Sequence, residues 1–275
     1  MSTSQECPDV IFNENCEQVD SSESEFCLNQ IVVYSLVFER GYLLSKGTTM
    51  NNCDSGRVAM TEAEEKLDRL LSDDGWIMCK QTKDGSKVMK QHRANEPNVY
   101  LFTGLINGTT VEQVATLINP LGPYRIQWDT QLKQIELLER VDKENVTNML
   151  KIRHLTHSRL KGLISERETV DLCRFHSDNG RRVVIMTDTT HPSDVPKPGV
   201  VRARTHLSAL VIEERPNRNV NLTAILQASV FLFGLPSVVV ESFFPKGIIK
   251  FFDDLRKASQ QNIIKNDSYE MPPGW

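Results

Sequence analysis

Residues 169–176, TVDLCRFH, contain an unusual placement of a charged side chain. In an extended strand Val170, Leu172 and Arg174 share one face, because successive side chains point to opposite sides of a sheet. A guanidinium keeps its proton, so leaving it unpaired on an apolar face costs several kcal/mol. Arg174 therefore either binds the polar end of an apolar ligand or pairs with a carboxylate at the rim of the sheet.

Other side chains of the kinds used in catalysis and metal binding occur without the spacing that such sites need. The sequence has no nucleophile elbow, phosphate-binding glycine loop or HExxH helix. His154 and His157 fall on opposite faces of a strand, and Cys173 alternates with Arg174, which favours a small packed thiol. These residues predict neither a catalytic centre nor a metal site.

Composition describes a nearly neutral globular chain. Its 275 residues carry 32 basic and 36 acidic side chains, and 39% are hydrophobic. Without a basic patch, nucleic acid is not an expected partner. No secretory signal opens the sequence, and the apolar stretch 230–240 is broken by Gly234 and Pro236. We therefore expect a cytoplasmic protein whose six cysteines are free thiols.

The distribution of charge and polarity divides the chain into three parts. Residues 1–60 form an acidic extension that is predicted to be largely disordered. Within it, residues 31–38, IVVYSLVF, either pack on the domain or bind a partner. Residues 61–265 are the predicted globular domain, and 266–275 are predicted to be a disordered tail.

The first half of the domain mixes helices and strands. Residues 61–71 read as a helix with Thr61 as N-cap and Glu64 completing a capping box. Strand patterns over 76–83, 87–93 and 99–106 predict an antiparallel meander. Two short helices follow, over 109–119 and 124–129.

The second half predicts six more strands and one long helix. Over residues 235–261 a stripe of apolar side chains recurs at helical spacing: Val240, Phe244, Ile248, Phe251 and Leu255. The only way to cover this stripe is to wrap the sheet around the helix. The fold class is therefore α+β, a curved antiparallel sheet of about nine strands around a long C-terminal helix, and such a sheet can enclose an apolar cavity.

Five separated stretches resemble one family in both sequence and order. They are DGWIMCK (74–80), YRIQWD (124–129), GLISERETVDL (162–172), HPSDVPKPGVVRA (191–203) and VVESFFPKGIIKFFDDLRKA (239–258). They resemble the START lipid-transfer domains, in particular the small soluble members that bind sterols and bile acids.

The resemblance implies a helix-grip fold with a tunnel for one lipid, no enzymatic activity and no cofactor. The expected function is to carry a sterol-like, bile-acid-like or isoprenoid ligand between membranes, as a monomer that contacts anionic membrane surfaces transiently. The alternative is a lipid-sensing regulatory module that acts on a protein partner through residues 1–60.

The resemblance also suggests which residues contact the ligand. Arg174 matches a buried arginine that pairs with an acid in cholesterol-binding relatives, but here Leu155 stands at the acid's position with His154 beside it. Either of these two could face the tunnel. Arg125 matches a position near the ligand or makes a surface salt bridge, and Trp128 walls the tunnel or anchors its helix. The remaining expected contacts are Met186, Phe233, Val240, Phe244, Ile248 and Phe251.

The last helix is the expected gate, because Pro245 removes a helical hydrogen bond and Gly247 adds backbone freedom within one turn. The loop 157–166 would form the opposing lip. Basic and apolar side chains on both elements are expected to contact the membrane: Arg159, Leu160, Lys161, Leu163, Lys246 and Lys250.

Overall fold

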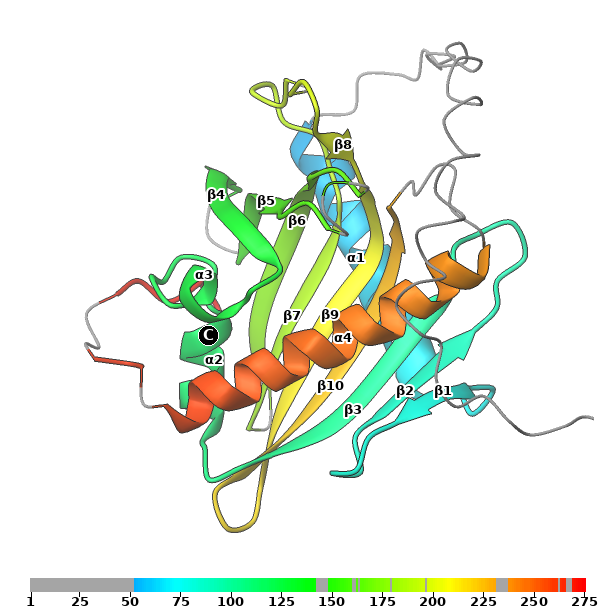
Figure 1. Cartoon of the computed structure of the whole chain (residues 1–275). Coiled ribbons are helices and arrows are strands. Elements are labelled where there is room, and N and C mark those ends of the chain that lie inside the picture. Colours follow the sequence, from blue (N-terminus) through cyan, green and yellow to red (C-terminus); the bar gives the residue numbers. More distant parts are fainter. Residues whose placement is uncertain are drawn as a thin grey trace, which may run out of the picture. The chain divides into compact units, whose positions relative to one another are not determined.

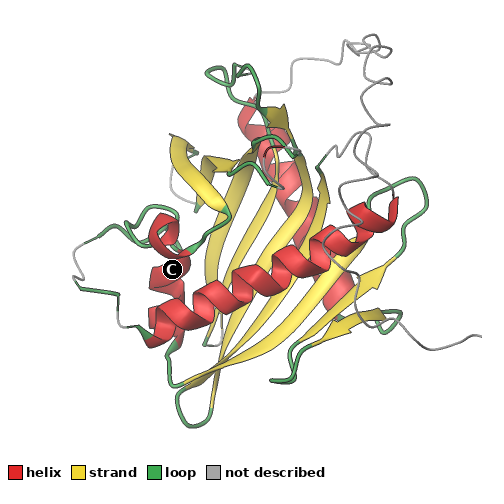
Figure 2. Ribbon diagram, in the orientation of Figure 1, coloured by secondary structure: helices red, strands yellow, loops and turns green. Residues whose placement is uncertain are grey.

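One curved antiparallel sheet forms the body of the fold, and a helix covers each of its faces (Figures 1 and 2). A computed structural model describes residues 52–141, 148–159, 162, 164–178, 180–195, 197–230, 237–261, 263–265 and 269–275. In chain order the elements are α1 (Asn52–Leu71), β1 (Ile77–Gln81), β2 (Lys87–Gln91), β3 (Val99–Asn107), α2 (Val111–Ile118), α3 (Arg125–Trp128), β4 (Leu132–Arg140), β5 (Met149–Thr156), β6 (Arg167–Asp178), β7 (Arg181–Asp188), β8 (Val201–Arg202), β9 (Arg204–Arg215), β10 (Asn219–Ser229) and α4 (Ser237–Gln260).

The strand order is β1-β2-β3-β10-β9-β7-β6-β5-β4, with the short β8 pairing in parallel to β6. Most neighbours are consecutive in the chain, while the pairing of β3 with β10 joins the first meander to the last strand. Helix α4 crosses the face of the sheet called here the inner face, and α1 lies against the other, outer face (Figure 1). The predicted α+β class, with about nine strands and a long C-terminal helix, is confirmed.

Helix α1 begins well before the predicted start at Thr61. The Thr61 hydroxyl donates to the carbonyl of Arg57 at 3.1 Å, inside the helix, so it does not cap an N-terminus. Buried side chains recur every three or four residues at Met60, Ala63, Leu67 and Leu70, and they pack on the outer face of the sheet. The predicted domain boundary at residue 60 therefore falls inside α1.

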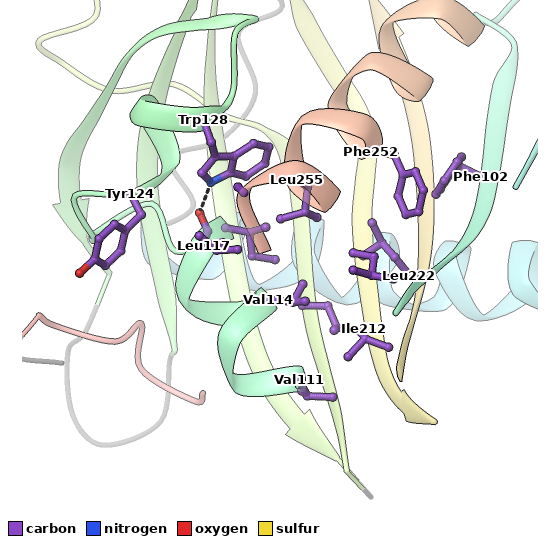
Figure 3. Packing of buried hydrophobic residues seen from close by; sticks show 14 of the residues in the cluster. Phe102, Val111, Val114, Leu117, Tyr124, Trp128, Ile212, Leu222, Phe252 and Leu255 are labelled. Atoms are coloured by element: carbon purple, nitrogen blue, oxygen red, sulfur yellow. Dashed lines mark hydrogen bonds between the residues drawn. The ribbon is translucent and has the colours of Figure 1, made fainter. Parts of the chain in front are cut away.

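The predicted short helices are present between the third and fourth strands. Helix α2 has a complete capping box, in which Thr110 accepts from the backbone of Gln113 and the Gln113 side chain accepts from the backbone of Thr110. Its apolar positions Val111, Val114 and Leu117 are buried against the inner face (Figure 3). The sequence pattern predicted this element correctly.

Helix α4 packs its apolar stripe into the inner face. Leu255 and Phe252 are fully buried, and Phe252 lies 4.7 Å from the ring of Phe102 on β3 (Figure 3). Gly104 makes this approach possible, because an added Cβ would stand 2.6 Å from Phe102 and 2.8 Å from Phe252. Phe252 was not part of the predicted stripe, yet it is the most enclosed aromatic side chain that the described part of α4 contributes.

The predicted disorder of the tail is contradicted where the structure describes it. Residues 269–275 pack on the domain, with Tyr269 against Tyr124 and Trp275 against Phe175. Proline, glycine and polar residues made this segment look disordered. Its two aromatic side chains bury apolar surface that the composition alone did not reveal.

We predict that Phe252→Ala lowers the free energy of unfolding by about 3–5 kcal/mol, because it leaves a cavity between α4 and β3. Leu105→Ala, on the facing strand β3, is the control. Leu105 is 43% exposed, so the free energy of unfolding of this variant should stay within about 0.5 kcal/mol of the wild type. Urea unfolding followed by circular dichroism measures both. Equal losses for the two variants would contradict the packing described here.

Candidate functional site

A small cavity lies between the inner face of the sheet and the segment α2–α3, and it is called here the inner cavity. Its volume is about 50 Å³. The wall is mostly aliphatic and aromatic and is built by Ile118, Pro120, Arg125, Ile135, Ile152, His154, Cys173, Phe175, Val184, Met186 and Leu210. Arg125 and His154 are the strongest hydrogen-bonding side chains in that wall.

Strand β6 turns Cys173 and Phe175 towards the inner cavity, so Arg174 points the other way. On the outer face the Arg174 guanidinium lies 2.9 Å from the carboxylate of Glu64 on α1. The expected role of Arg174 as an interior hook is therefore wrong, and the alternative of a carboxylate partner is correct. Val170 and Leu172 do share its face, but that face is covered by α1.

Strand β5 places His154, and not Leu155, in the wall of the inner cavity. In the pairing of β5 with β6, His154 lies opposite Thr169 and Leu155 opposite Glu168. Opposed residues point to the same side of a sheet, so His154 joins Thr169, Asp171 and Cys173 on the inner face. Leu155 is buried but does not line the cavity.

The inner face carries a buried polar cluster that the sequence analysis did not identify. Asp171 is 3% exposed, and its Oδ2 accepts from the Thr169 hydroxyl at 2.6 Å and lies 3.1 Å from His154 Nδ1. Its second oxygen, Oδ1, has no hydrogen-bond partner among the described residues. Burial, with Asp171 nearby, raises the pKa of the Cys173 thiol well above its usual range. The strand alternation could have revealed this, since Asp171 shares a face with Cys173 and Phe175, opposite to the face of Arg174.

Arg125 is a largely enclosed cation at the edge of the inner cavity, with 16% of its side chain exposed. Its guanidinium pairs with Asp129 at 2.7 Å and lies 4.7 Å from the ring centres of both Trp128 and Phe251. Burial lowers its pKa, and the carboxylate of Asp129 opposes that shift. Its Nε lacks a hydrogen-bond partner within the described chain. The salt bridge considered from the sequence is thus a partly buried ion pair, in which Arg125 lines the cavity and Asp129 is buried behind it.

The aromatic side chains predicted to line a tunnel instead fill much of it. Trp128 donates its indole N–H to the carbonyl of Leu117 at 2.8 Å and packs 5.5 Å from Phe251, so it anchors α3 (Figure 3). Phe244 stacks on Tyr100 at 5.1 Å, and Ile248 packs in the same core. None of the described lining residues of the inner cavity comes from α4. Met186 lines the inner cavity. Phe233 and the side chain of Val240 lie outside the described residues.

A second cavity of about 120 Å³, called here the mouth cavity, opens beside α4. Its lining residues are Gln131, Thr156, His157, Arg159, Ile164, Arg167, Val230 and Phe243. Burial lowers the pKa of Arg167. Thr156 follows His154 by two residues on β5, and Arg167 precedes Thr169 by two on β6, so the mouth cavity continues along the same inner face.

The structure describes three of the six residues expected to contact a membrane. Arg159 lines the mouth cavity and donates to the carbonyl of Thr130 at 3.3 Å, while Lys246 is exposed on α4. Lys250 is engaged with Asp254 at 2.6 Å. Leu160, Lys161 and Leu163 lie outside the described residues.

A third cavity, of about 210 Å³, lies between α1 and the outer face of the sheet. It is larger than the other two but its rim is charged, with Glu64, Asp68 and Arg181 above an aliphatic floor. It therefore suits an apolar guest less well than the inner face does.

In the part of the chain that the structure describes, no three His, Cys, Asp or Glu side chains gather as a metal site would require. No helix in that part is long and apolar enough to cross a bilayer.

Comparison with known proteins agrees with this geometry. The family described as START domain matches residues 57–263. StAR-related lipid transfer protein 5 from Bos taurus is 30% identical over 212 residues, which is 76% of this chain and 97% of that protein.

Solved structures lead to the same group. The structure of human StAR-related lipid transfer protein 5 superimposes with a TM-score of 0.65 at 28% identity, covering 74% of this chain and 98% of the other. Human STARD10 matches with a TM-score of 0.61 over 78% of this chain and 82% of its own, but at 15% identity it supports the fold alone.

Asp254 holds α4 closed over this site and gives a pH-dependent prediction. It is 6% exposed and accepts hydrogen bonds from Lys250 and from Thr130, the latter in the link between α3 and β4. Burial acts to raise the pKa of Asp254, but these hydrogen bonds outweigh it and lower the pKa. A carboxylate with a lowered folded-state pKa stabilises the fold above its unfolded pKa, and this stability is lost as the pH falls through the folded value.

We therefore expect Asp254→Asn to be less stable than the wild type at neutral pH by about 1–3 kcal/mol. The difference should shrink as the pH falls below about 4, where the carboxylate begins to protonate in the unfolded chain while it is still ionised in the fold. Urea unfolding across this pH range tests it. Asp253→Asn, which removes a more exposed partner of Arg256 on the same helix, is the control and should cost less. A pH-independent difference for Asp254→Asn would argue against the ionised pair.

Proposed function

Because the chain belongs to the START domain family, we propose that it is a non-enzymatic carrier that binds one sterol-like or other compact polycyclic or isoprenoid lipid on the inner face of the sheet. In this proposal it moves the lipid between membranes in the cytoplasm and acts as a monomer. The observation that carries the proposal is an apolar inner face that holds two cavities and a few buried polar groups, one cavity beneath the α2–α3 segment and the other beside α4.

The two cavities support a single elongated binding site. Cys173 and Phe175 line the inner cavity, and Arg167, on the same face of β6, lines the mouth cavity. Six residues of extended strand span ~20 Å, which is roughly the length of a sterol. The cluster of His154, Thr169 and Asp171 lies between them. A guest would therefore run along β5 and β6 and meet this cluster midway.

The volume of the inner cavity requires movement before such a guest can enter. Pockets for molecules of this size usually hold roughly 300–1,000 Å³, far more than the inner cavity offers. Phe244, Ile248 and Phe251 of α4 pack against the core of the inner face, so a guest of this size would have to displace α4 side chains. Pro245 weakens the helix at this point, and the Gly247 carbonyl accepts from Gln131 Nε2 at 3.0 Å, a bond that opening would break. We infer that α4 is the gate.

Polar groups on the inner face suit a ligand with an oxygen function. Arg125 Nε is an unused donor for a carboxylate, keto or hydroxyl oxygen. Asp171 Oδ1 is an unused acceptor for a hydroxyl hydrogen. A hydroxylated, otherwise apolar lipid would satisfy the second group, and one that also has an acidic or keto end would satisfy both.

The physical need for a carrier follows from the hydrophobic effect. Moving a lipid with about twenty buried carbons into water costs on the order of 15 kcal/mol of free energy, so unassisted exchange between membranes is slow. Opening α4 only at a bilayer would avoid exposure to water. Arg159 beside the mouth cavity and Lys246 on α4 would attract anionic headgroups, while Lys250 is held by Asp254 and contributes less.

The proposal is tested by native mass spectrometry of the purified protein, followed by extraction and identification of any bound lipid. We expect one unmodified lipid per chain, with a rigid apolar body and at least one oxygen function. Recovery of no lipid, together with no uptake of sterol or bile acid from vesicles, would refute the carrier function.

Substitution tests whether Arg125, which lines the inner cavity, contacts the ligand and whether Arg174, on the outer face, does not. Arg125→Gln combined with Asp129→Asn removes both charges of the buried pair and should weaken binding of a fluorescent bile acid by roughly tenfold to a hundredfold. Arg174→Leu should leave that affinity unchanged, because Arg174 faces α1. Fluorescence titration measures both, and circular dichroism confirms folding. Equal affinities for the double variant and the wild type would exclude Arg125 as a ligand contact.

A further inference from the structure

Residues 269–275 lie across the end of the inner cavity that is farthest along β6 from the mouth cavity, beside α2 and α3 (Figure 1). We propose that this segment, called here the strap, is an end wall of the ligand site that limits the length of the lipid and slows its escape at that end. The proposal rests on the lipid-carrier function and adds a residue-level determinant of ligand choice.

Trp275 is the side chain through which the strap contacts the wall of the inner cavity. Its ring meets Phe175 edge-on at 5.2 Å, and its indole N–H donates to the carbonyl of Val183 at 3.1 Å. It packs on the cluster that includes Ile152, Cys173 and Val184, all of which line the inner cavity. Phe175 also lines that cavity, so Trp275 backs the wall directly.

The strap is also attached at the end of α2. The Tyr269 hydroxyl donates to Thr116 Oγ1 at 2.6 Å, and the Glu270 carbonyl accepts from Asn119 Nδ2 at 2.7 Å. Asn119 is fully buried and precedes Pro120, another lining residue. Glu270 pairs with Arg140 on β4 at 2.7 Å. The strap thus bridges α2, β4 and the β6–β7 hairpin around one end of the cavity.

Gly274 lets the strap lie flat against β6. Its φ of 94° is in the left-handed region, and an added Cβ would stand 2.2 Å from the backbone oxygen of Phe175. The carbonyl of Gly274 accepts from the Ser177 hydroxyl at 3.0 Å, and the backbone N–H of Trp275 donates to Pro272 at 3.2 Å. This tight turn aims the Trp275 ring at Phe175.

The strap lies beyond the residues matched by the family, which end at 263. It is therefore an addition to the matched domain, placed where it closes one end of the site. With that end closed, a guest enters and leaves through the mouth cavity, and a side chain that extends past Phe175 has to displace Trp275.

The test compares two tryptophan variants of the full chain. Trp275→Ala opens the end wall, whereas Trp76→Ala removes a tryptophan that packs on the outer-face core and serves as the matched control. Dehydroergosterol, a fluorescent sterol, is loaded and its release to phosphatidylcholine vesicles is timed. We expect Trp275→Ala to release it on the order of tenfold faster, equivalent to about 1.4 kcal/mol in the barrier. Trp76→Ala and Trp275→Phe should release it at close to the wild-type rate.

Ligand length provides a second arm. A sterol that carries a nitrobenzoxadiazole group on its side chain should bind the wild type weakly and Trp275→Ala more tightly. Wild-type behaviour of Trp275→Ala in both arms, in a protein that does bind dehydroergosterol, would overturn the strap while leaving the carrier function intact. If the wild type binds no sterol, these two arms do not apply; the carrier function is then decided by the lipid-recovery and bile-acid tests given above, and the strap is judged by a readout that needs no ligand.

That readout is the reactivity of Cys173, which is 1% exposed and lines the inner cavity. Methyl methanethiosulfonate, a small uncharged thiol reagent, should modify Cys173 faster in Trp275→Ala than in Trp76→Ala, as measured by peptide mass spectrometry. Equal rates in the two variants would overturn the end wall irrespective of ligand. Thermal unfolding of both variants identifies any rate change that comes from general loss of stability.

Discussion

The contact between α4 and the inner face of the sheet is the interaction on which this structure depends. A curved sheet of this size cannot leave its apolar inner face in water, and α4 covers it with Phe252 and Leu255 at the closest point. The same contact occupies the space that a lipid would need. Under the proposed function, stability and lipid binding compete for one surface, and the helix that completes the core would have to move during loading.

Polar groups on that inner face make sense only in this setting. Among the described residues, one oxygen of Asp171 and one N–H of Arg125 lack a partner, although Asp171 is buried and the Arg125 side chain is only 16% exposed. Buried polar atoms left unsatisfied cost free energy, so their presence in an otherwise apolar wall is consistent with a ligand that completes them. The charged pairs on the outer face, such as Arg174 with Glu64, are already complete and serve to hold α1.

Much of the fold was predictable because it follows from local rules. The short helix α2, the three-stranded meander and the apolar periodicity of α4 each involve residues close in sequence. The site was less predictable. Arg174 was assigned to the interior because Val170 and Leu172 look like core residues, and indeed they are, but they belong to the core beneath α1. A sheet covered on both faces has two apolar sides, so alternation alone does not tell which one encloses the ligand.

The sequence by itself determined the class of fold, the family resemblance and the order of the elements, since these depend on periodicity, turn residues and short-range motifs. Only the tertiary structure decided which parity of β5 and β6 faces inward, how closely α4 packs on the sheet, and that Trp275 packs on Phe175. Each of these depends on contacts between residues far apart in the chain: β6 with α1, α4 with β3, and Trp275 with Phe175. Such contacts are set by the packing of whole elements, and no local pattern specifies them.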